Sequence, residues 1–464
     1  MTDRTLRAIG ELLDSTRPPG SFAARHTASA ENLALEIAGV GSLRWPVPPD
    51  QARQLCEIAR PARYGRREQT LLDPNVRHTW EVPRDNVTID HDRWHAMVTP
   101  VLDAIRADLG IPPSRALSAE FHSMLVYETG QFFRRHQDSE KTDGMIGTLV
   151  VTLPSTFTGG DLVIEHRGQR VIDTGSPDEL TFVAFYPDCE HEVLPITGGY
   201  RISLTFNLVV AEDASKTDSS TPAVAGLAER LREHFATPVP VPSWMRGDGP
   251  ESRPPRLLVR LLDHQYSQRG LGWDQLKGVD SARAAALVTA AQEADCAIAL
   301  ALADVRESYA CDEFEDEDWM CGMRRRWARV DGTWKVVGQD WEAIEGEDEP
   351  FEQAPGESPT AADHPARFGS LGQEQMSWSH TTLTWWIDRR GGPAVQTALS
   401  ITDDELCHSG AEPAVHPYAF ESKGYMGNEG NTMDRWYRRA AIVVWARQQP
   451  IELPAMTTAD SGAH

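Results

Sequence analysis

Between residues 121 and 210, apolar and polar residues alternate with a period of two, and clusters of Gly, Pro, Asp or Ser separate the runs. Such alternation is typical of β-strands that turn one face to a core. Eight short strands are predicted here, at 121–129, 132–138, 145–153, 161–166, 168–174, 179–187, 191–196 and 200–210. Eight strands in about ninety residues, joined by tight turns, favour a double-sheet jelly roll.

The segment 1–120 has a mixed pattern, and we interpret it as a helical and irregular support region for that core. Short helices are predicted at 4–14 and 50–60. In the stretch 92–109, apolar residues recur at i, i+3 and i+4, which is the stripe of an amphipathic helix. The sequence IPPS at 111–114 ends this helix, because proline cannot continue it.

After residue 210 the pattern changes. The small, polar residues at 211–223 predict a linker, and residues 224–464 predict a C-terminal α+β domain without a catalytic role. An Ala- and Leu-rich helix is expected from Ser281 to about Ser308, followed by strands at 326–338, 381–388 and 440–446. A degenerate second barrel is the alternative for this half, since 437–447 faintly resembles 200–210. The fold class predicted for the whole chain is therefore α+β.

Charge and cysteine content narrow the possible partners. The chain has 464 residues, with 69 Asp and Glu against 45 Lys and Arg, giving a formal net charge of −24. Such a surface repels phosphate backbones and anionic lipids, so we expect no nucleic acid and no membrane as partner. No apolar run reaches the length of about 18 residues needed to span a membrane. The six scattered cysteines and the lack of a secretory signal predict a cytoplasmic protein.

Two histidines and one aspartate carry the chemical prediction. His136 and Asp138 stand two residues apart in a predicted strand and therefore share one face. His191 lies in a later strand, which a jelly roll can bring back beside the first. Two imidazoles and one carboxylate on one side of a metal suit non-haem Fe(II) and leave coordination positions open.

A basic residue follows at a useful distance. Arg201 lies ten residues after His191, across the turn 196–199. Its guanidinium can grip a carboxylate through two parallel hydrogen bonds. Ser203 faces the same way and can add a second contact. Arg77 and Trp80 are further candidates, at the substrate entrance.

The segment 127–138, YETGQFFRRHQD, resembles the prolyl 4-hydroxylase branch of the 2-oxoglutarate/Fe(II) dioxygenases. The later HEVLPITGGYRISLTFNL at 191–208 is similar to the second half of that family, and GGDL at 159–162 to its GG-x-L turn. The resemblance covers 121–210 and extends more loosely over 65–120. It does not extend to 224–464.

The resemblance implies a role for six residues. Iron would be held by His136, Asp138 and His191. The co-substrate 2-oxoglutarate would be held by Arg201, Tyr127 and Ser203, with an arginine where prolyl hydroxylases often have lysine. The implied cofactors are Fe(2+) and 2-oxoglutarate, with ascorbate as an open addition.

The implied reaction consumes O2 and 2-oxoglutarate, hydroxylates a C–H bond, for example of a prolyl or other amino-acid residue, and releases succinate and CO2. Three alternatives stay open at this point. The first is a hydroxylase of a small-molecule metabolite. The second is a non-catalytic jelly-roll scaffold with a vestigial metal site. The third is a cupin-like metalloenzyme that does not use 2-oxoglutarate.

Overall fold

The structure is a computed structural model, and it describes most of the chain. The described residues are 2–15, 20–66, 69–138, 144–210, 222–241, 249–310, 323–330, 333–341, 375–389, 393–407, 417–423, 432–449 and 451. The predicted linker at 211–223 therefore lies outside the described residues except for its last two positions. The acidic stretches 312–318 and 343–369 lie outside them entirely.

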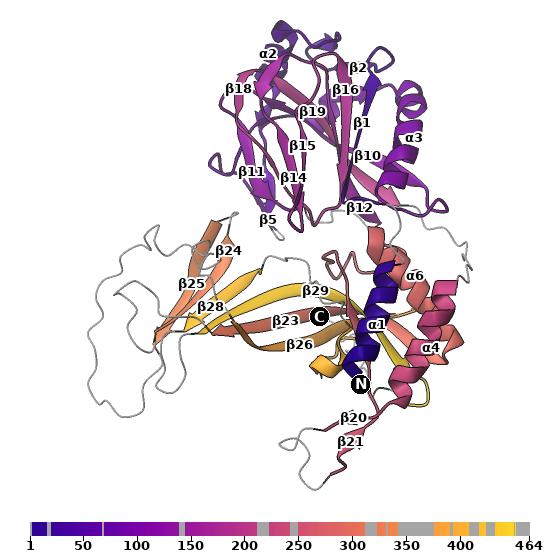
Figure 1. The fold of residues 1–464 in the computed structure, drawn as a ribbon. Helices are drawn as coiled ribbons and strands as arrows, with labels where there is room; N and C mark the ends of the chain where they lie inside the picture. Colours follow the sequence, from indigo (N-terminus) through magenta and orange to yellow (C-terminus); the bar gives the residue numbers. More distant parts are fainter. Residues whose placement is uncertain are drawn as a thin grey trace, which may run out of the picture.

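Two antiparallel sheets form a sandwich in the first half of the chain (Figure 1). The larger sheet contains, in spatial order, β1 (Ala23–Ser29), β16 (Glu179–Phe185), β12 (Met145–Thr152), β19 (Arg201–Val210), β10 (Leu117–Tyr127), β8 (Trp80–Val82) and β4 (Arg60–Pro61). The smaller sheet contains β15 (Gln169–Asp173), β14 (Leu162–His166), β17 (Glu190–Val193), β11 (Phe132–His136) and β7 (Arg77–His78).

One hydrophobic core fills the space between the two sheets. Strand β12 lies inside the larger sheet, between β16 and β19, and is buried along its whole length. Its Leu149 and the Phe206 of β19 join the same core as Ile164 of the smaller sheet. The apolar alternation in 121–210 is thus explained by burial against the facing sheet.

Helices and small sheets cover this sandwich. The helix α3 (His91–Asp108) begins after Asp90, whose side chain accepts a hydrogen bond from Arg93 N at 3.0 Å. Its apolar stripe is buried and packs on the larger sheet, so the helix predicted at 92–109 is confirmed. The other covering elements are α2 (Pro49–Ile58), η1 (Arg84–Asn86), β2 (Leu35–Ile37), β3 (Gly41–Ser42), β9 (Val87–Ile89), β5 (Tyr64–Arg66), β6 (Gln69–Leu71), β13 (Phe157–Gly159) and β18 (Ile196–Gly199).

The second half of the chain builds one large antiparallel sheet, which we call the C-terminal sheet. Its strands are, in spatial order, β25 (Thr333–Trp341), β24 (Met323–Val330), β28 (Ala419–Lys423), β29 (Thr432–Ala446), β23 (Cys296–Ala310), β26 (Gln375–Asp388) and β27 (Leu399–Ile401), with β22 (Leu258–Leu261) paired to β29. Smaller elements are β20 (Val239–Pro240), β21 (Ser252–Arg253) and η4 (Asp403–Glu405).

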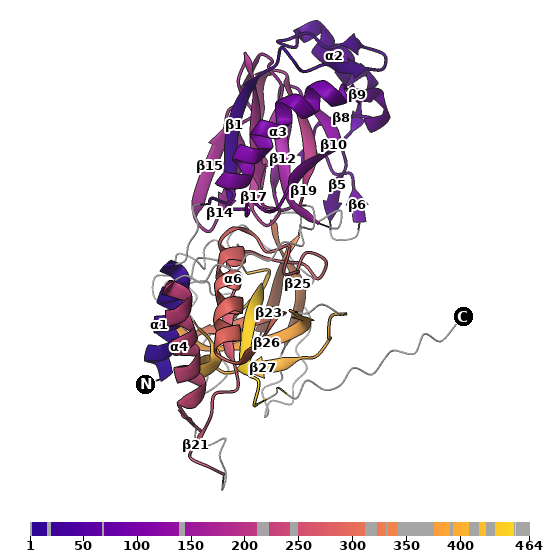
Figure 2. The same cartoon turned by 90° about the vertical axis from the view of Figure 1, so that its right-hand side faces the viewer.

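Three helices pack on one side of the C-terminal sheet (Figure 2). They are α4 (Pro222–Ala236), α6 (Gly278–Glu293) and α1 (Thr2–Ser15). Leu6, Ile9 and Leu13 of α1 are buried in a core with Leu227 of α4 and Leu287 of α6. The first helix of the chain therefore packs with elements that follow the sandwich in the sequence, and not with the sandwich itself.

The helix expected from Ser281 to about Ser308 is correct only in its first half. Helix α6 ends at Glu293, Asp295 adopts a left-handed φ of 54°, and the chain continues as strand β23. The residues of β23 lie between β26 and β29 and are buried on both faces near its start. A strand buried on both faces has a continuous apolar sequence, which periodicity does not distinguish from a buried helix.

The mixed α/β composition, with mostly antiparallel sheets and few helices, is consistent with the predicted jelly roll. Strand β1 was not expected, and it extends the larger sheet by pairing with β16 from Ala23 to Ser29. Among the described residues, no helix has both the length and the apolar character needed to cross a membrane.

Candidate metal centre

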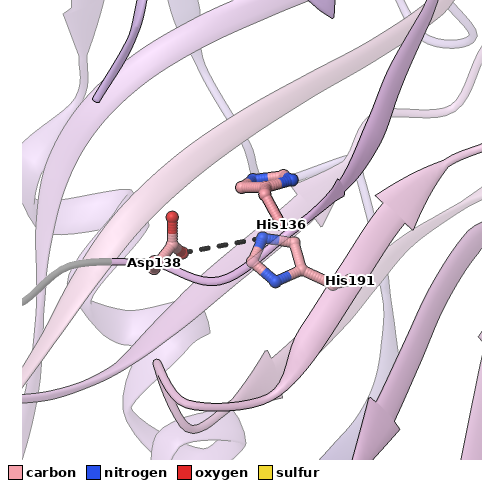
Figure 3. A group of neighbouring side chains, drawn as sticks. All are labelled: His136, Asp138 and His191. Carbon is pink, nitrogen blue, oxygen red and sulfur yellow. Dashed lines mark ion pairs between the residues drawn. The ribbon is translucent and has the colours of Figure 1, made fainter. Parts of the chain in front are cut away.

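His136 and His191 lie side by side on neighbouring strands. Strands β11 and β17 pair in antiparallel register with His136 directly opposite His191. The two ring centroids are 4.1 Å apart, and Figure 3 shows the rings beside each other; both residues line one pocket. The pairing of β11 with β17 therefore brings together two imidazoles that are distant in the sequence.

Asp138 reaches the same point from the residues that follow β11. Its backbone N–H donates a hydrogen bond to Pro187 O at 3.1 Å, which fixes the chain just after the strand. Its Oδ2 lies 3.8 Å from His191 Nε2 (Figure 3). One ligand atom from each of His136, Asp138 and His191 lies within 4.8 Å of the others, a spacing at which the three could hold a metal ion.

Both imidazoles are oriented by backbone carbonyls. His136 Nδ1 lies 2.8 Å from Arg134 O, and His191 Nδ1 lies 3.1 Å from Cys189 O. A carbonyl only accepts, so each Nδ1 donates its N–H, and Nε2 is the ring atom of each histidine that is left to bind a metal. This arrangement is the usual second layer around a metal-binding histidine.

The charge state of His136 also suits a ligand. Burial lowers its pKa well below the ordinary value of 6.5, and His191 lowers it further, while Asp138 opposes the shift. The ring is therefore neutral at physiological pH. A neutral imidazole is the form that binds a metal.

Arg201 is a buried cation in the same pocket. It is 1% exposed, and its Nη2 donates to Thr152 Oγ1 at 3.0 Å, while its Nη1 lies 3.5 Å from Ser203 Oγ. Its Nε has no hydrogen-bond partner, and no carboxylate of the described residues lies within ion-pair distance. Burial lowers its pKa, yet an arginine stays protonated. A buried guanidinium with an unsatisfied N–H is prepared for an anionic ligand.

Tyr127 and Ser203 border Arg201. In the pairing of β10 with β19, Tyr127 is opposite Arg201 and Leu125 is opposite Ser203. The guanidinium carbon of Arg201 lies 5.9 Å from the centre of the Tyr127 ring. All six residues predicted from the sequence, His136, Asp138, His191, Arg201, Tyr127 and Ser203, line one pocket.

Several pocket residues were not expected from the sequence. Thr148 of β12 donates a hydrogen bond to Asp138 Oδ2 at 2.5 Å. Thr152, behind the pocket wall, accepts from Arg201. Thr205 and Asn207 continue the face of β19 that starts with Arg201 and Ser203. Their signal was available, because polar residues at every second position of a strand that is otherwise apolar mark a pocket wall.

The predicted residues at the substrate entrance separate into two groups. Arg77 lines the pocket, with its guanidinium 4.5 Å from the centre of the Phe133 ring. Trp80 does not line it and instead donates from Nε1 to Glu128 Oε2 at 2.6 Å. Glu190, next to His191, is 9% exposed and accepts from Arg135 Nε at 2.6 Å.

A protein-family model described as the 2OG-Fe(II) oxygenase superfamily matches residues 122–209. This segment runs from β10 to β19 and contains all six predicted site residues. Residues 122–209 belong to the 2OG-Fe(II) oxygenase superfamily. The predicted enzyme class, a 2-oxoglutarate-dependent dioxygenase, is thereby confirmed, and Fe(2+) and 2-oxoglutarate are the cofactors that this superfamily implies.

Solved structures of oxygenases align with the chain at low identity. A prolyl-4-hydroxylase from Pseudomonas putida shares 20% identity over 44% of this chain and 98% of its own, with a TM-score of 0.25. A Trichoplax adhaerens prolyl hydroxylase was solved with a peptide fragment of the hypoxia inducible factor oxygen degradation domain. It shares 15% identity over 44% of this chain and 90% of its own, with a TM-score of 0.27. A 2OG-Fe(II) oxygenase family member from Burkholderia pseudomallei shares 14% identity over 32% of this chain and 72% of its own, with a TM-score of 0.23. A comparison with the curated proteins finds no match.

The oxygenase segment fits both cofactors chemically. Two imidazole Nε2 atoms and one carboxylate are the donor set of a facial non-haem Fe(II) site. The unpartnered Nε of buried Arg201 fits the distal carboxylate of a dicarboxylic acid. A second group with metal-ligand chemistry, formed by His166, Asp188 and His264, joins the two halves of the chain and was not expected from the sequence.

Proposed function

We propose that the protein is an Fe(II)- and 2-oxoglutarate-dependent hydroxylase whose iron ligands are His136, Asp138 and His191. The observation that carries this proposal is the convergence of these three side chains in a pocket that also contains the buried Arg201. Bound iron would supply the activation of dioxygen, coupled to the decarboxylation of 2-oxoglutarate to succinate and CO2. The chain would supply ligand geometry, a grip on the co-substrate and exclusion of water.

Arg201 would bind the distal carboxylate of 2-oxoglutarate. Its guanidinium is held from both sides by Thr152 and Ser203, so its direction is fixed before the ligand arrives. Tyr127, opposite Arg201 on the neighbouring strand, would donate a hydrogen bond from its hydroxyl group to the same co-substrate. Fixed donors in a site closed to water bind an anion more strongly than mobile ones do.

The substrate would enter beside Arg77. This residue lines the pocket from β7, on the side of the ligand strand β11. The motif resemblance of 127–138 to prolyl 4-hydroxylases favours a prolyl or other amino-acid residue as substrate. A free small molecule is the second substrate class, and ascorbate dependence is an open property of the same reaction.

We also propose a division of labour along the chain. The jelly-roll core at 121–210 would carry the chemistry, and 224–464 would form a non-catalytic α+β domain. Residues 1–120 would support the core except for helix α1, which packs with α4 and α6 instead. Among the described residues, two clusters of His and Asp have the spacing of metal ligands. Each cluster includes residues of the sandwich, and neither lies wholly in the C-terminal half, which supports this division. A cytoplasmic location stays a prediction.

Co-substrate binding tests the proposal most directly. Anaerobic addition of Fe(II) and 2-oxoglutarate to the purified protein should give a weak visible charge-transfer absorption, and admission of air should then release succinate. His136→Ala should lose both signals while keeping the melting temperature of a folded protein. If the wild-type protein gives neither signal, the scaffold alternative replaces this proposal.

Two further measurements separate the remaining alternatives. Arg201→Met should abolish the absorption that depends on 2-oxoglutarate; unchanged turnover would favour a cupin-like enzyme that does not use this co-substrate. Mass spectrometry should identify the substrate as a product heavier by one oxygen atom. Peptides and small-molecule extracts of the host are compared with and without 2-oxoglutarate.

A further inference from the structure

Three consecutive carbonyls hold the residues of the metal centre. We call Pro187, Asp188 and Cys189 the ligand turn. Pro187 O accepts from the backbone N–H of Asp138 at 3.1 Å, and Cys189 O meets His191 Nδ1 at 3.1 Å. Between them, Asp188 O accepts from Gln137 Nε2 at 2.6 Å. The position of this turn thus sets the position of two of the three proposed ligands.

The side chain of Asp188 points away from the metal centre and into the C-terminal half of the chain. Its carboxylate lies 3.2 Å from Lys277 Nζ and 3.0 Å from His264 Nδ1, and it accepts from the backbone N–H of Gln265 at 3.1 Å. Lys277 is 2% exposed and the side chain of Asp188 is 5% exposed. The ligand turn is therefore fastened by a buried ion pair to residues outside the oxygenase segment.

The carboxyl group of Asp188 is ionised in the folded protein. Burial alone would raise the pKa of Asp188, but Lys277 and His264 outweigh burial and hold this pKa well below its ordinary value. Lys277 Nζ also donates to Gln265 O at 2.8 Å. Because both groups are buried, the loss of either one would leave an uncompensated charge beside the ligand turn.

Tyr186, the residue before the ligand turn, also contacts the C-terminal half. Tyr186 donates from its hydroxyl to Leu109 O at 2.6 Å and accepts from the backbone N–H of Gly278 at 2.9 Å. Gly278 follows Lys277 and opens helix α6. One short segment of the C-terminal half therefore contacts both Tyr186 and Asp188.

The group His166, Asp188 and His264 has the spacing of a metal site, but its details favour the ion pair. The rings of His166 and His264 are stacked, with centroids 4.8 Å apart and planes at 15°. His166 Nδ1 is 3.9 Å from Asp188 Oδ2, whereas the ammonium of Lys277 is closer to the same carboxylate. A cation of the protein itself thus already neutralises Asp188.

We propose that Lys277 is a positioning residue for the metal centre, which acts through Asp188 and the ligand turn on Asp138 and His191. The inference rests on the proposed function, because it takes these two residues as metal ligands. It gives the C-terminal half a role in metal affinity. Loss of the Lys277 ammonium should weaken metal binding although Lys277 contacts none of the ligands.

A second ion pair between the two halves provides a matched control. Arg167, in the turn between β14 and β15, lies 2.5 Å from Asp263 in the C-terminal half. Their side chains are 14% and 16% exposed, so this pair is largely buried as well. The ion pair that joins them does not include any residue of the ligand turn. Arg167→Gln therefore removes an ion pair across the same junction without releasing the turn.

The test measures metal affinity in the full chain. Mn(II) is titrated calorimetrically into the metal-free wild-type, Lys277→Met, Lys277→Arg and Arg167→Gln proteins, and the melting temperature of each is recorded. Lys277→Met should weaken Mn(II) binding by about 10-fold, the lower end of the loss that follows removal of a direct partner of a ligand, because Lys277 acts on the ligands only through the turn. Lys277→Arg should recover most of this loss, and Arg167→Gln should bind Mn(II) like the wild type.

The outcomes separate the two proposals. Equal Mn(II) affinity in Lys277→Met and wild type, or an equal loss in Arg167→Gln, overturns the positioning role and leaves the proposed function standing. A wild-type protein that binds no Mn(II) overturns the metal centre itself. If Lys277→Met does not fold, the double variant Asp188→Asn with Lys277→Gln, which leaves no unpaired charge, takes its place and should show the same weakening.

Discussion

Thr148 donates a hydrogen bond from Oγ1 to Oδ2 of Asp138 across 2.5 Å. The bond joins the fully buried strand β12 of the larger sheet to a residue that follows β11 in the smaller sheet. The same Oδ2 lies 3.8 Å from His191 Nε2, so the hydroxyl of Thr148 holds the carboxylate oxygen that faces this imidazole. The metal centre is therefore supported by both sheets.

Replacing Thr148 by Val should weaken metal binding while leaving the fold intact. Valine has nearly the same shape but no hydroxyl, so only the orientation of Asp138 is lost. Removal of such a partner typically lowers metal affinity about 10- to 100-fold. Calorimetric titration with Mn(II) checks this, with Thr148→Ser as the control that keeps the hydroxyl. An unchanged affinity in Thr148→Val would show that Asp138 is oriented by other groups.

Arg201→Lys should raise the apparent KM for 2-oxoglutarate by about 10- to 100-fold, because lysine keeps the charge but not the two-pronged donor geometry. Succinate release at varied 2-oxoglutarate concentration measures this effect. Ser203→Ala is the milder companion, since Ser203 Oγ meets Arg201 Nη1 only at 3.5 Å. A KM for Ser203→Ala as high as that for Arg201→Lys would contradict the assignment of Arg201 as the main anchor.

Gly160→Ala should destabilise the protein and impair co-substrate binding. Gly160 has a φ of +71°, and a Cβ there would lie 2.1 Å from Ile196 Cδ1 and 3.3 Å from Arg201 Cδ. Backbone strain and overpacking together should cost about 3 kcal/mol in the free energy of unfolding. Denaturant unfolding and the KM for 2-oxoglutarate measure the two effects.

The control for that substitution is Gly168→Ala. Gly168 has a φ of +77°, but a Cβ at this position would meet no atom within 4 Å. It should therefore show the backbone strain alone, about 1–2 kcal/mol, with an unchanged KM. If both variants raised the KM equally, the closeness of Gly160 to Arg201 would not matter for the binding of 2-oxoglutarate.

His166 should make stability fall as the pH decreases below neutrality. Burial and the neighbouring His264 lower the pKa of His166 from 6.5 to about 4, with Arg167 in the same direction and Asp188 and Asp263 opposed. Between pH 6.5 and 4 the unfolded chain binds a proton at this histidine that the folded protein excludes. The free energy of unfolding therefore decreases across this window, by about 3 kcal/mol from this group.

His166→Gln should remove that part of the pH dependence. Denaturant unfolding of both proteins at several pH values between 7 and 4 measures the difference in slope. The two curves should be closest to parallel above pH 7, where His166 is neutral in both states. Parallel curves throughout the window would mean that His166 accepts a proton in the folded protein.

Local pattern was sufficient for much of the oxygenase segment. The alternation in 121–210 indicated the strands because each has one face in a shared core, and the stripe in 92–109 indicated α3 because four of its residues are buried on one side. The spacing of His136 and Asp138 could be interpreted because a strand fixes which residues share a face. His191 was expected from a later strand, and the pairing of β11 with β17 places it opposite His136.

Contacts between distant segments were not predictable in this way. His264 has no acidic residue two positions away in the sequence. Its partner Asp188 lies 76 residues earlier, so only the folded structure shows the contact. Strand β23 was expected as helix, because its Ala and Leu residues have high helix propensity and only the pairing with β26 and β29 makes them a strand. In each case the deciding interaction comes from residues that no local window contains.

Helix α1 shows that the sandwich is topologically an insertion. Leu6, Ile9 and Leu13 pack with Leu227 and Leu287, so the chain begins one structural unit, builds another, and then returns to complete the first. During translation, α1 must wait for residues beyond 222 before its apolar face is covered. An expression fragment that ends at 210 should therefore start after α1. If it includes α1, the apolar face of this helix is exposed to solvent and should promote aggregation.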